Sequence, residues 1–511
     1  MVRNVLEYLE MTVTKFPNKI AFDDDKKQIT YAELFEQAKS IGSTLLDLGI
    51  ERKPVVVYLP KSCDCITAFM GIVYSGGFYC PIDVTMPIER ISIIVDVLKP
   101  AAVITNVKLF DKAQSFCGEC KVILFDEAIA SGINEKAING IRRTAIDSDP
   151  LYVLFTSGST GVPKGVLISH KSVVDYTEWV STTFDINDFS VFGNQAPFYF
   201  DNSILDIYSS IKNGGKVVII PKKKFMFPID LVRYLNEKEI NIIFWVPSMM
   251  CMMANLKAFD VEIPRYLTKV LFCGEIMPNK QLNIWRKAIP NALYANLYGP
   301  TEITDVCTYY IVDREFADDE PLPIGIPCQN TRILVLNEKN QIVQKDESGE
   351  LCVAGTCLAL GYYNNPNKTK EVFVQNPLNT AYEEKIYRTG DLVKYNEYGE
   401  LMYLSRKDFQ IKHLGHRIEL GEIETATGDI SEVENCACIY IDEEQEIVMC
   451  YTGMEMTAQD ISSHLKSKIP TYMIPGRYVY CKKMPYNING KIDRLELKKD
   501  IMKKESNLEA E

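Results

Sequence analysis

The chain has 511 residues, of which 47% are hydrophobic and 24% charged, a composition that is ordinary for a globular enzyme. This length predicts two domains or more. The formal net charge of -12 argues against a nucleic-acid partner, because affinity for a phosphate backbone depends on clustered Lys and Arg.

The first ten residues predict an amphipathic helix rather than a signal peptide, because acidic residues interrupt the apolar run. No stretch approaches the roughly 20 apolar residues that cross a membrane, so we expect no membrane insertion and a cytoplasmic location. In that reducing compartment the 15 cysteines are expected to be buried or inert thiols and not a disulfide framework. Cys117 and Cys120 form the one Cys-x-x-Cys pair, for which we expect neither zinc nor redox chemistry.

Short apolar runs alternate with helical patterns through the first 300 residues or so, which predicts an α/β fold on a large sheet. The runs are residues 55–59, 102–105, 216–220, 240–244 and 269–272. From about residue 320 to 404, short strands with Gly and Asn turns predict a β-rich subdomain. A new α+β unit of roughly 100 residues follows, so we place the domain boundary between residues 1–407 and 408–511.

A loop rich in small residues lies between two apolar runs, with the sequence Thr156-Ser-Gly-Ser-Thr-Gly-Val-Pro-Lys-Gly165. Small residues let backbone N–H groups approach phosphate oxygens, and Lys164 adds a positive charge. Further donors are the hydroxyls of Thr156, Ser157, Ser159 and Thr160. The loop therefore predicts a polyphosphate site, although it does not fit the P-loop template G-x-x-x-x-G-K-[ST].

Four further motifs follow in a fixed order: Asn296-Leu-Tyr-Gly-Pro-Thr-Glu302, Tyr387-Arg-Thr-Gly-Asp391, residues 405–424, and Asn489-Gly-Lys-Ile-Asp493. Together with the loop, they make the chain resemble the adenylate-forming superfamily of acyl-CoA synthetases, luciferase and the adenylation domains of nonribosomal peptide synthetases. The resemblance covers nearly the whole chain. It implies ATP and Mg²⁺ as cofactors, a large N-terminal domain of layered α/β subdomains, and a small mobile C-terminal domain.

The resemblance also implies roles for single residues. Glu302 would hold Mg²⁺, Thr301 would contact the α-phosphate, and Tyr298 would stack on adenine. Asp391 would bind the ribose hydroxyls with help from Arg406. The remaining nucleotide-site residues that it implies are Glu275, Asn296 and Gly299.

The resemblance further implies that the small domain rotates between two half-reactions. Lys491 would bridge the substrate carboxylate and the phosphate during adenylation, and would then leave so that a thiol can reach the same face. The hinge would be Asp408, and Gly415 would line the tunnel for the pantetheine thiol. Hinges of this kind concentrate large backbone changes in very few residues.

The substrate is expected to be an amino acid. Asp201 resembles the carboxylate that pairs with the α-ammonium in the amino-acid branch, and a buried charge needs such a partner. The segments around Asp201 and Cys273 resemble D-alanine:carrier protein ligases, in which the Cys favours the D enantiomer. Leu297 departs from that pattern, and Asp305 could point an extra carboxylate at the substrate.

D-alanine, transferred to a separate phosphopantetheinylated carrier protein, is therefore the best single hypothesis. No phosphopantetheine-bearing segment follows Lys491. The alternatives are a different amino acid for a nonribosomal peptide pathway, an acyl- or aryl-CoA ligase, and a non-catalytic relative. Asp201 favours the first two hypotheses over the CoA ligase, whereas Lys164, Glu302, Asp391 and Lys491 argue against a non-catalytic role.

Overall fold

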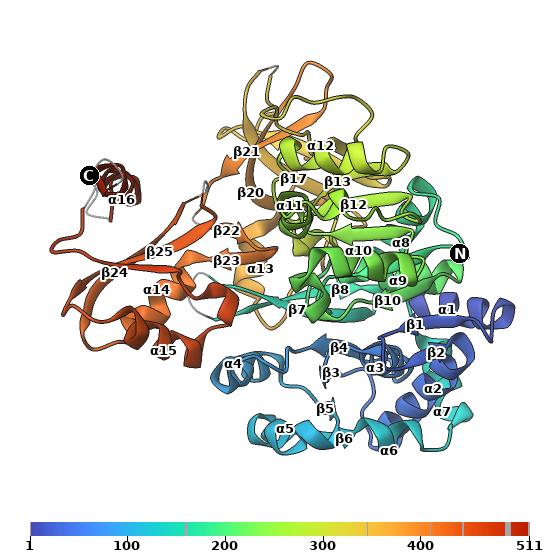
Figure 1. Ribbon diagram of the computed structural model, residues 1–511. Helices are drawn as coiled ribbons and strands as arrows, with labels where there is room; N and C mark the ends of the chain where they lie inside the picture. The colour runs from blue at the N-terminus through green and yellow to red at the C-terminus, as the bar shows by residue number, and fades with distance from the viewer. Residues whose placement is uncertain are drawn as a thin grey trace. The chain divides into compact units, whose positions relative to one another are not determined.

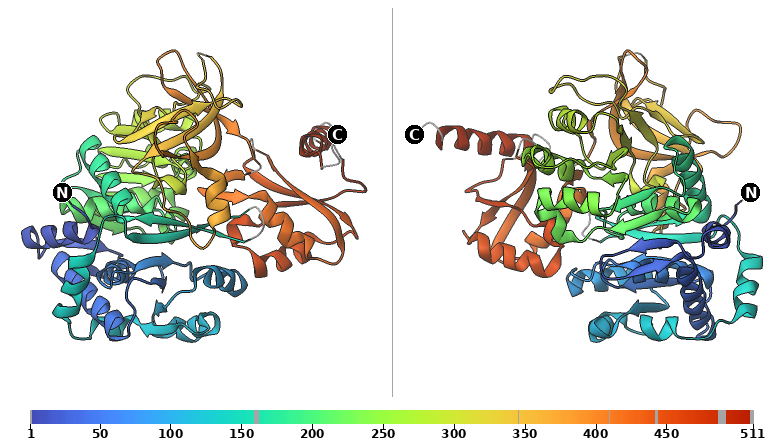
Figure 2. Two further views of the ribbon diagram at one scale, coloured as in Figure 1. Left: turned by 180° about the vertical axis from the view of Figure 1, so that it is seen from behind. Right: turned by 45° about the vertical axis from the view of Figure 1, so that its right-hand side comes forward.

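The computed structural model describes residues 2–158, 162–344, 346–408, 410–441, 444–485 and 492–508, and only the backbone of 503–508. The chain divides into two compact units (Figures 1 and 2). The larger unit comprises Met1–Val84, Val97–Leu154 and Gly165–Lys407. The smaller comprises Thr85–Asp96, Phe155–Lys164 and Asp408–Glu511. The two inner segments of the smaller unit belong to the core in the prediction, and the division at 407/408 into an adenylation core and a rotating domain stays a prediction.

The larger unit contains a nine-stranded sheet with the order β15-β14-β13-β12-β11-β9-β10-β1-β2. Its strands from β13 to β1 run parallel, and β2, β14 and β15 pair antiparallel to their neighbours. The bounds are β1 Ile20–Asp23, β2 Gln28–Thr30, β9 Val191–Asn194, β10 Lys216–Ile219, β11 Ile242–Trp245, β12 Lys269–Cys273, β13 Leu293–Tyr298, β14 Thr308–Ile311 and β15 Ile326–Pro327.

The central strands of this sheet are apolar on both faces, as parallel strands covered by helices must be. In β12, Val270 and Phe272 join one core cluster, whereas Leu271 and Cys273 join the other. The first cluster packs under α10 (Pro228–Glu237), α11 (Pro247–Asn255) and α12 (Asn279–Ala288). The second packs under α8 (His170–Thr183) and α9 (Ser203–Asn213). The side chain of Cys273 therefore lies on the face of the sheet that α8 and α9 cover.

A second sheet of seven strands has the order β18-β8-β7-β4-β3-β5-β6. Its strands are β3 Pro54–Tyr58, β4 Phe78–Pro81, β5 Ala102–Thr105, β6 Lys121–Leu124, β7 Pro150–Thr156, β8 Lys164–Ser169 and β18 Gly361–Tyr362. Residues of α1–α3, β3 and β4 share the large core cluster with the nine-stranded sheet. The N-terminal helices are α1 Val5–Lys15, α2 Tyr31–Asp47, α3 Cys63–Tyr74, α4 Ile88–Leu98, α5 Phe110–Cys117, α6 Phe125–Ile129 and α7 Glu135–Thr144.

The β-rich subdomain is a five-stranded antiparallel sheet in which β16, β17, β20 and β19 are neighbours and β21 pairs with β20. Its elements are β16 Thr331–Leu336, β17 Gly349–Gly355, α13 Pro366–Val372, β19 Phe373–Gln375, β20 Lys385–Tyr395 and β21 Leu401–Arg406. This sheet brings Asp391 opposite Arg406.

The smaller unit contains a three-stranded sheet in the order β24-β25-β26 and the hairpin β22-β23. Leu414 and Gly415 form the hairpin turn with φ angles of 50° and 77°. Positive φ at both central positions matches the right-handed twist of the strands, and Gly favours the second position. The elements are β22 Gln410–His413, β23 His416–Glu419, α14 Leu420–Gly428, β24 Val433–Ile441, β25 Glu446–Gly453, α15 Ala458–Lys468, β26 Arg477–Tyr480 and α16 Arg494–Leu508. The predicted fold class, a large α/β domain with a β-rich subdomain and a small α+β C-terminal domain, is confirmed.

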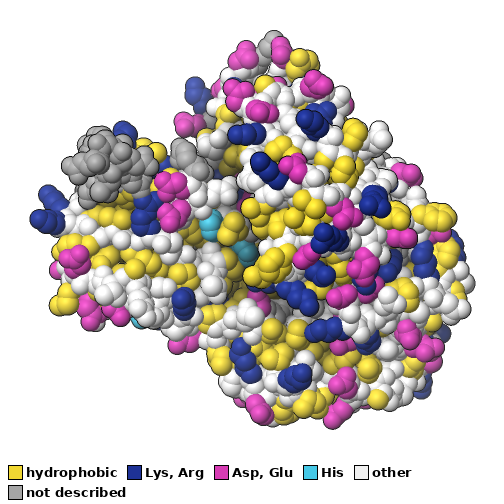
Figure 3. All heavy atoms as spheres, viewed as in Figure 1, with side chains coloured by type: hydrophobic (Ala, Val, Ile, Leu, Met, Phe, Trp, Pro, Cys, Tyr) yellow, Lys and Arg dark blue, Asp and Glu magenta, His cyan; other side chains and the backbone are white. Residues whose placement is uncertain are grey.

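Cysteine pairing differs from the prediction. Cys117 and Cys120 form a disulfide, because α5 ends at Cys117 and the turn at Gly118, with φ 61°, brings the two Cα atoms to 5.4 Å. The other cysteines are free and mostly buried. Among the described residues, no helix is long and apolar enough to cross a membrane. On the face shown in Figure 3, Lys and Arg side chains are interspersed with Asp and Glu.

His170, the first residue of α8, is buried and accepts a hydrogen bond from the backbone N–H of Val5 at Nδ1, at 3.4 Å. Burial, with a smaller contribution from the charge of Arg142, lowers its pKa to about 3. Because the folded-state pKa lies below the unfolded value near 6.5, the stability that this histidine contributes is present above that value and is lost as the pH falls.

We therefore expect the free energy of unfolding to fall by about 1.4 kcal/mol between pH 7.5 and 5.5 through His170 alone. The measurement is denaturant unfolding at both pH values for the unaltered protein and His170→Gln, which keeps an acceptor but does not titrate. An equal pH dependence in the two proteins would contradict a buried, neutral His170.

Candidate active site

The candidate site lies where strands of the nine-stranded sheet end. Ligands of parallel α/β sheets bind outside the carboxyl ends of the strands. Asp201 lies between the end of β9 and the start of α9, and Cys273 and Tyr298 are the last residues of β12 and β13. Cys273 also pairs with Leu297, so these two predicted substrate residues are neighbours in the sheet.

Asp201 is 8% exposed, so its carboxylate has lost most of its contact with water. Burial raises the pKa of Asp201, a hydrogen bond from Thr301 opposes this, and the nearby charge of Glu302 raises the pKa further. The backbone N–H of Asn202 donates to Asp201 Oδ1 at 3.1 Å. A positive charge beside Asp201 would therefore be favoured by both burial and its anionic neighbour.

Glu302 lies in the 3₁₀ turn Thr301–Ile303 and is fully buried. Tyr362, the last residue of β18, donates its hydroxyl to Glu302 Oε1 at 2.6 Å. The turn thus brings the hydroxyl of Thr301 and the carboxylates of Asp201 and Glu302 into one polar cluster. The roles of these three residues stay predictions.

Asp305 follows the same turn and is also buried. It and Thr304 have φ angles of 72° and 61°, a left-handed conformation that is uncommon outside glycine and recurs at functional sites. Tyr176 on α8 donates its hydroxyl to Asp305 Oδ2 at 2.5 Å. Burial, and then the charge of Asp201, hold the pKa of Asp305 well above its usual range, although the Tyr176 bond opposes them. Asp305 is therefore a further buried carboxylate near Asp201, in addition to Glu302.

Three predicted nucleotide residues meet at a different point of the larger unit. Tyr298 donates its hydroxyl to Asp391 Oδ2, and Arg406 donates to Asp391 Oδ1 at 2.7 Å. Asp391 is buried, and its ion pair with Arg406 compensates its charge. The structure thus joins Tyr298, Asp391 and Arg406 in one hydrogen-bonded group.

The other predicted nucleotide residues of the larger unit have mainly backbone partners. Asn296 donates to the carbonyl of Pro323 at 2.8 Å, and Glu275 Oε2 accepts the backbone N–H of Ser248 at 2.8 Å. Gly299 packs against Asp305 and Val306, where a Cβ would overlap the carbonyl of Asp305.

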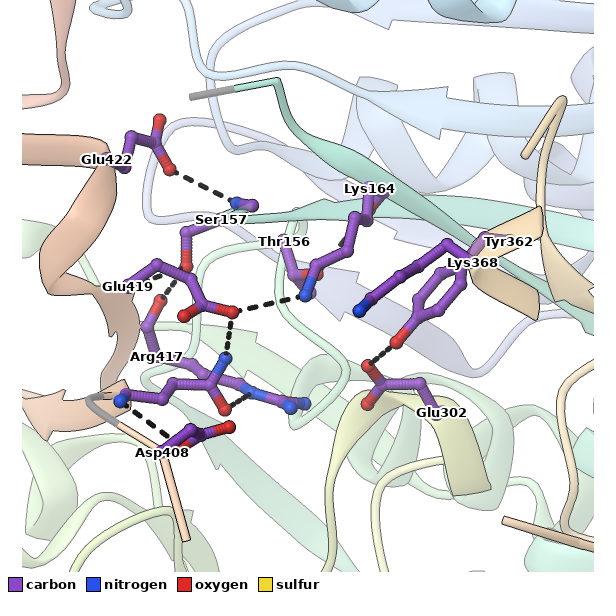
Figure 4. A network of polar contacts seen from close by, with 12 residues as sticks. Thr156, Ser157, Lys164, Glu302, Tyr362, Lys368, Asp408, Arg417, Glu419 and Glu422 are labelled. Carbon is purple, nitrogen blue, oxygen red and sulfur yellow. Dashed lines mark hydrogen bonds and ion pairs between the residues drawn. The ribbon is translucent and has the colours of Figure 1, made fainter. Parts of the chain in front are cut away.

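The loop predicted to bind phosphate contacts β23 and α14 within the smaller unit, as Figure 4 shows. Ser157 donates its hydroxyl to the carbonyl of Arg417 at 2.9 Å and accepts the N–H of Glu419 at 3.1 Å. Lys164 Nζ lies 3.2 Å from Glu419 Oε1. The N–H of Gly158 donates to Glu422 Oε2 at 3.3 Å. Carboxylates of the smaller unit therefore bind the donors that would hold a phosphate.

The predicted hinge and thiol-tunnel residues, Asp408 and Gly415, lie just before and just after β22. Asp408 accepts the N–H of Gln410 at its Oδ1, and Gly415 lies at the tip of the β22-β23 hairpin. Ser159, Thr160 and Lys491 lie outside the described residues.

Sequence reasoning missed the partners that hold these carboxylates and the loop. They are Tyr176, Tyr362, Arg90, Glu419 and Glu422. Arg90 pairs with Glu422 through buried side chains. In the sequence, the only sign of this buried pair is that Arg90 and Glu422 are charged residues next to apolar ones.

Comparison with known proteins decides the family. Residues 9–363 match the model of AMP-binding enzymes, and residues 422–491 match the model of their C-terminal domain. This chain is an AMP-binding enzyme. The predicted resemblance to the adenylate-forming superfamily is confirmed.

Relatives of the enzyme span its whole length. It is 32% identical to a D-alanine–D-alanyl carrier protein ligase of Listeria monocytogenes, over 98% of the enzyme and 100% of the ligase. It is 31% identical to bacitracin synthase 1 of Bacillus licheniformis, over 96% of the enzyme and 9% of the synthase. A solved adenylation domain of Vibrio cholerae, AlmE in complex with glycyl-adenosine-5'-phosphate, has the same fold with a TM-score of 0.84, 20% identity and 98% coverage of both chains.

Gly299 provides a test of the close packing around the turn at Glu302. A Cβ at Gly299 would lie 2.8 Å from Cα of Val306 and overlap the carbonyl of Asp305. Such overpacking typically costs about 1–3 kcal/mol, so Gly299→Ala should lower the free energy of unfolding by about 2 kcal/mol.

The matched control is Gly140→Ala in α7, where no atom lies within 4 Å of the new Cβ. This change should be neutral or stabilise by up to about 1 kcal/mol. Denaturant unfolding of both variants is the measurement. An unchanged stability of Gly299→Ala would show that this turn is not closely packed.

Proposed function

We propose that the enzyme activates D-alanine with ATP as its aminoacyl adenylate and then passes the aminoacyl group to the phosphopantetheine thiol of a separate carrier protein. The observation that carries this proposal is Asp201. Its buried carboxylate lies at the carboxyl end of the sheet, beside a second buried carboxylate, Glu302, that opposes its ionisation. A substrate ammonium is the charge that this environment favours. Full-length similarity to relatives that are named D-alanine–D-alanyl carrier protein ligases supports the choice of substrate.

In the first half-reaction, a carboxylate oxygen of the amino acid would attack the α-phosphorus of ATP. The new bond is the mixed anhydride, and pyrophosphate leaves with the electrons of the broken P–O bond. Asp201 would hold the ammonium of the amino acid while Thr301, bonded to it, lies beside the reacting phosphate. Since anionic groups are brought together, the enzyme's main work is to align and neutralise them.

Nucleotide binding would use the group formed by Tyr298, Asp391 and Arg406. Arg406 holds one oxygen of Asp391, which fixes the carboxylate as an acceptor for the ribose hydroxyls. Tyr298 is placed by its own bond to Asp391, so adenine stacking and ribose binding would be coupled. Asn296, Gly299 and Glu275 would shape the surroundings of the base.

Glu302 fits a magnesium ion. Its carboxylate is fully buried and carries a charge that opposes the ionisation of Asp201. Carboxylate and hydroxyl oxygens, completed by water and phosphate oxygens, are ligands that Mg²⁺ prefers. The ion would neutralise part of the phosphate charge when bound. Among the described residues, no group of three or more His, Cys, Asp or Glu side chains could hold a metal by itself, which agrees with a site completed by the nucleotide.

The smaller unit would serve the second half-reaction. Glu419 and Glu422 bind Lys164 and Gly158, whereas the phosphates of ATP need the same donors. These carboxylates and the phosphates of ATP would therefore compete for the same donors. In this proposal the loop binds the phosphates until pyrophosphate leaves, through Thr156, Ser157, Ser159, Thr160 and Lys164. Lys491 would contact the adenylate while it forms. Rotation of the smaller unit at Asp408 would then bring Gly415 to the thiol tunnel.

A second candidate substrate is an amino acid with a polar or basic side chain. Asp305 favours it, because burial and Asp201 oppose its ionisation and a second cation would relieve both effects. Cys273 and Leu297 favour a small side chain instead, since both are buried neighbours at the strand ends.

The test is ATP–pyrophosphate exchange with D-alanine, L-alanine, glycine, D-serine, D-lysine and a fatty acid, followed by transfer to a phosphopantetheinylated carrier protein. We expect the highest exchange with D-alanine. One methyl group in a pocket typically discriminates by about 1–3 kcal/mol, roughly 10- to 200-fold, so L-alanine should react measurably but slowly. Cys273→Ala should narrow the difference by raising kcat/KM for L-alanine more than for D-alanine.

Clear preference for D-lysine would assign specificity to Asp305 and overturn the D-alanine assignment while leaving adenylation of amino acids intact. Exchange with the fatty acid alone would overturn the whole proposal. If Cys273→Ala changed both enantiomers equally, Cys273 would have no role in the choice between them.

A further inference from the structure

A lysine distant in sequence from Asp201 contacts the segment that carries it. Lys61 lies between β3 and α3, and its ammonium donates to the main-chain carbonyls of Asn194 at 3.3 Å and Gln195 at 3.0 Å. Its Nζ also lies over the ring of Phe198, 5.4 Å from the centroid. An ammonium so placed gives up much of its hydration, so these contacts must replace the lost water.

Asp206 on α9 completes the arrangement. It is 1% exposed and accepts a hydrogen bond from Asn194 Nδ2 at 2.8 Å. Burial raises its pKa to about 7, which the bond from Asn194 and the charge of Lys61 oppose. Lys61 in turn has a pKa lowered by burial to about 7, with Asp206 as the largest opposing influence. Lys61 and Asp206 therefore both hold the end of β9, Lys61 through main-chain carbonyls and Asp206 through the side chain of Asn194.

This segment leads directly to Asp201. The backbone N–H of Phe200 bonds to the carbonyl of Pro197 at 3.1 Å, and the N–H of Ile204 bonds to the carbonyl of Asp201 at 2.8 Å. The chain thus makes a short bonded turn from the contacts of Lys61 to the start of α9. A shift of Asn194 and Gln195 would be passed on to the carboxylate of Asp201, because only five residues intervene and the bond from Phe200 to Pro197 closes a turn within them.

Hydrogen-bond donors are scarce around Lys61. Asn194 Oδ1, Gln195 Oε1 and Asp206 Oδ1 are buried without a hydrogen-bond partner among the described residues. Removal of the ammonium would also leave the carbonyl of Gln195 without this hydrogen bond. A buried acceptor without a hydrogen bond lowers the stability of the fold by its desolvation penalty. The segment would then move to find other donors.

We propose that Lys61 is a positioning residue for the amino-acid substrate: its ammonium fixes the carbonyls of Asn194 and Gln195, and through them the Asp201 carboxylate that receives the substrate ammonium. This inference rests on the proposed role of Asp201. It assigns Lys61 an effect on the amino acid and not on ATP, because the carbonyls of Asn194 and Gln195 and the ring of Phe198 all lie on the chain between the end of β9 and Asp201.

The experiment measures ATP–pyrophosphate exchange with separate titrations of D-alanine and ATP. Lys61→Met should raise KM for D-alanine at least 10-fold and KM for ATP less than 3-fold, and Lys61→Arg, which keeps a charged donor, should recover most of the loss. Lys61→Gln, an uncharged donor, replaces the Met variant if that one does not fold. Combined with Asp201→Ala, the Lys61→Met change should add less than 3-fold, since both act through one carboxylate.

The matched control is Lys112→Met. Lys112 also donates to a main-chain carbonyl, that of Val84 at 2.9 Å, and lies over an aromatic ring, 5.7 Å from the Tyr58 centroid. Neither contact involves residues 194–201, so loss of Lys112 should leave KM for D-alanine within about 2-fold.

Equal rises of both KM values, additivity with Asp201→Ala, or the same effect from Lys112→Met would overturn the positioning role and leave the proposed function standing. If the unaltered enzyme showed no exchange with any amino acid, the proposed function would fail, and the role of Lys61 with it.

Discussion

Burial of carboxylates at one end of the nine-stranded sheet is the constraint on which the site depends. Asp201, Glu302 and Asp305 are 8%, 0% and 1% exposed. The charge of Glu302 opposes the ionisation of Asp201, and the charge of Asp201 opposes the ionisation of Asp305. Desolvation of one unpaired ion costs several kcal/mol, so such a group persists only where ligands or hydrogen bonds compensate it. Hydroxyls of Tyr176, Tyr362 and Thr301 supply part of this compensation. In our account, the substrate ammonium and the metal supply the rest.

The fold explains why these groups meet. Parallel strands end at one edge, so residues that follow β9, β12 and β13 converge although up to about a hundred positions separate them in the chain. The turn after β13 is closely packed, with Gly299 against Asp305 and two residues at positive φ. Rigid placement of carboxylates is what an enzyme that must align anions needs. In the smaller unit, by contrast, the carboxylates of Glu419 and Glu422 bind donors of the loop.

Much of this was predictable from the sequence, and the missing part has a physical reason. Periodicity predicted the sheet-based core and the β-rich subdomain, and the resemblance to the adenylate-forming superfamily pointed to Asp201, Glu302 and Asp391. Contacts between distant segments were not predictable, because Tyr176, Tyr362 and Lys61 are ordinary residues whose importance comes only from where the fold places them. The pairing of Cys117 with Cys120 was also missed, since local geometry rather than compartment brings the two thiols together.

The central claim is that Asp201 pairs with the substrate ammonium, and one thermodynamic cycle tests it most directly. Calorimetry would measure the binding of a non-hydrolysable D-alanyl adenylate analogue and of its des-amino counterpart to the enzyme and to Asp201→Asn. Removal of one partner of a buried charge pair costs about 3–5 kcal/mol, which corresponds to roughly 150- to 5,000-fold in affinity. The account therefore predicts that loss of the amino group weakens binding to the unaltered enzyme by at least about 150-fold, and by less than about 5-fold in the variant. The same loss in both proteins would show that Asp201 does not receive the ammonium.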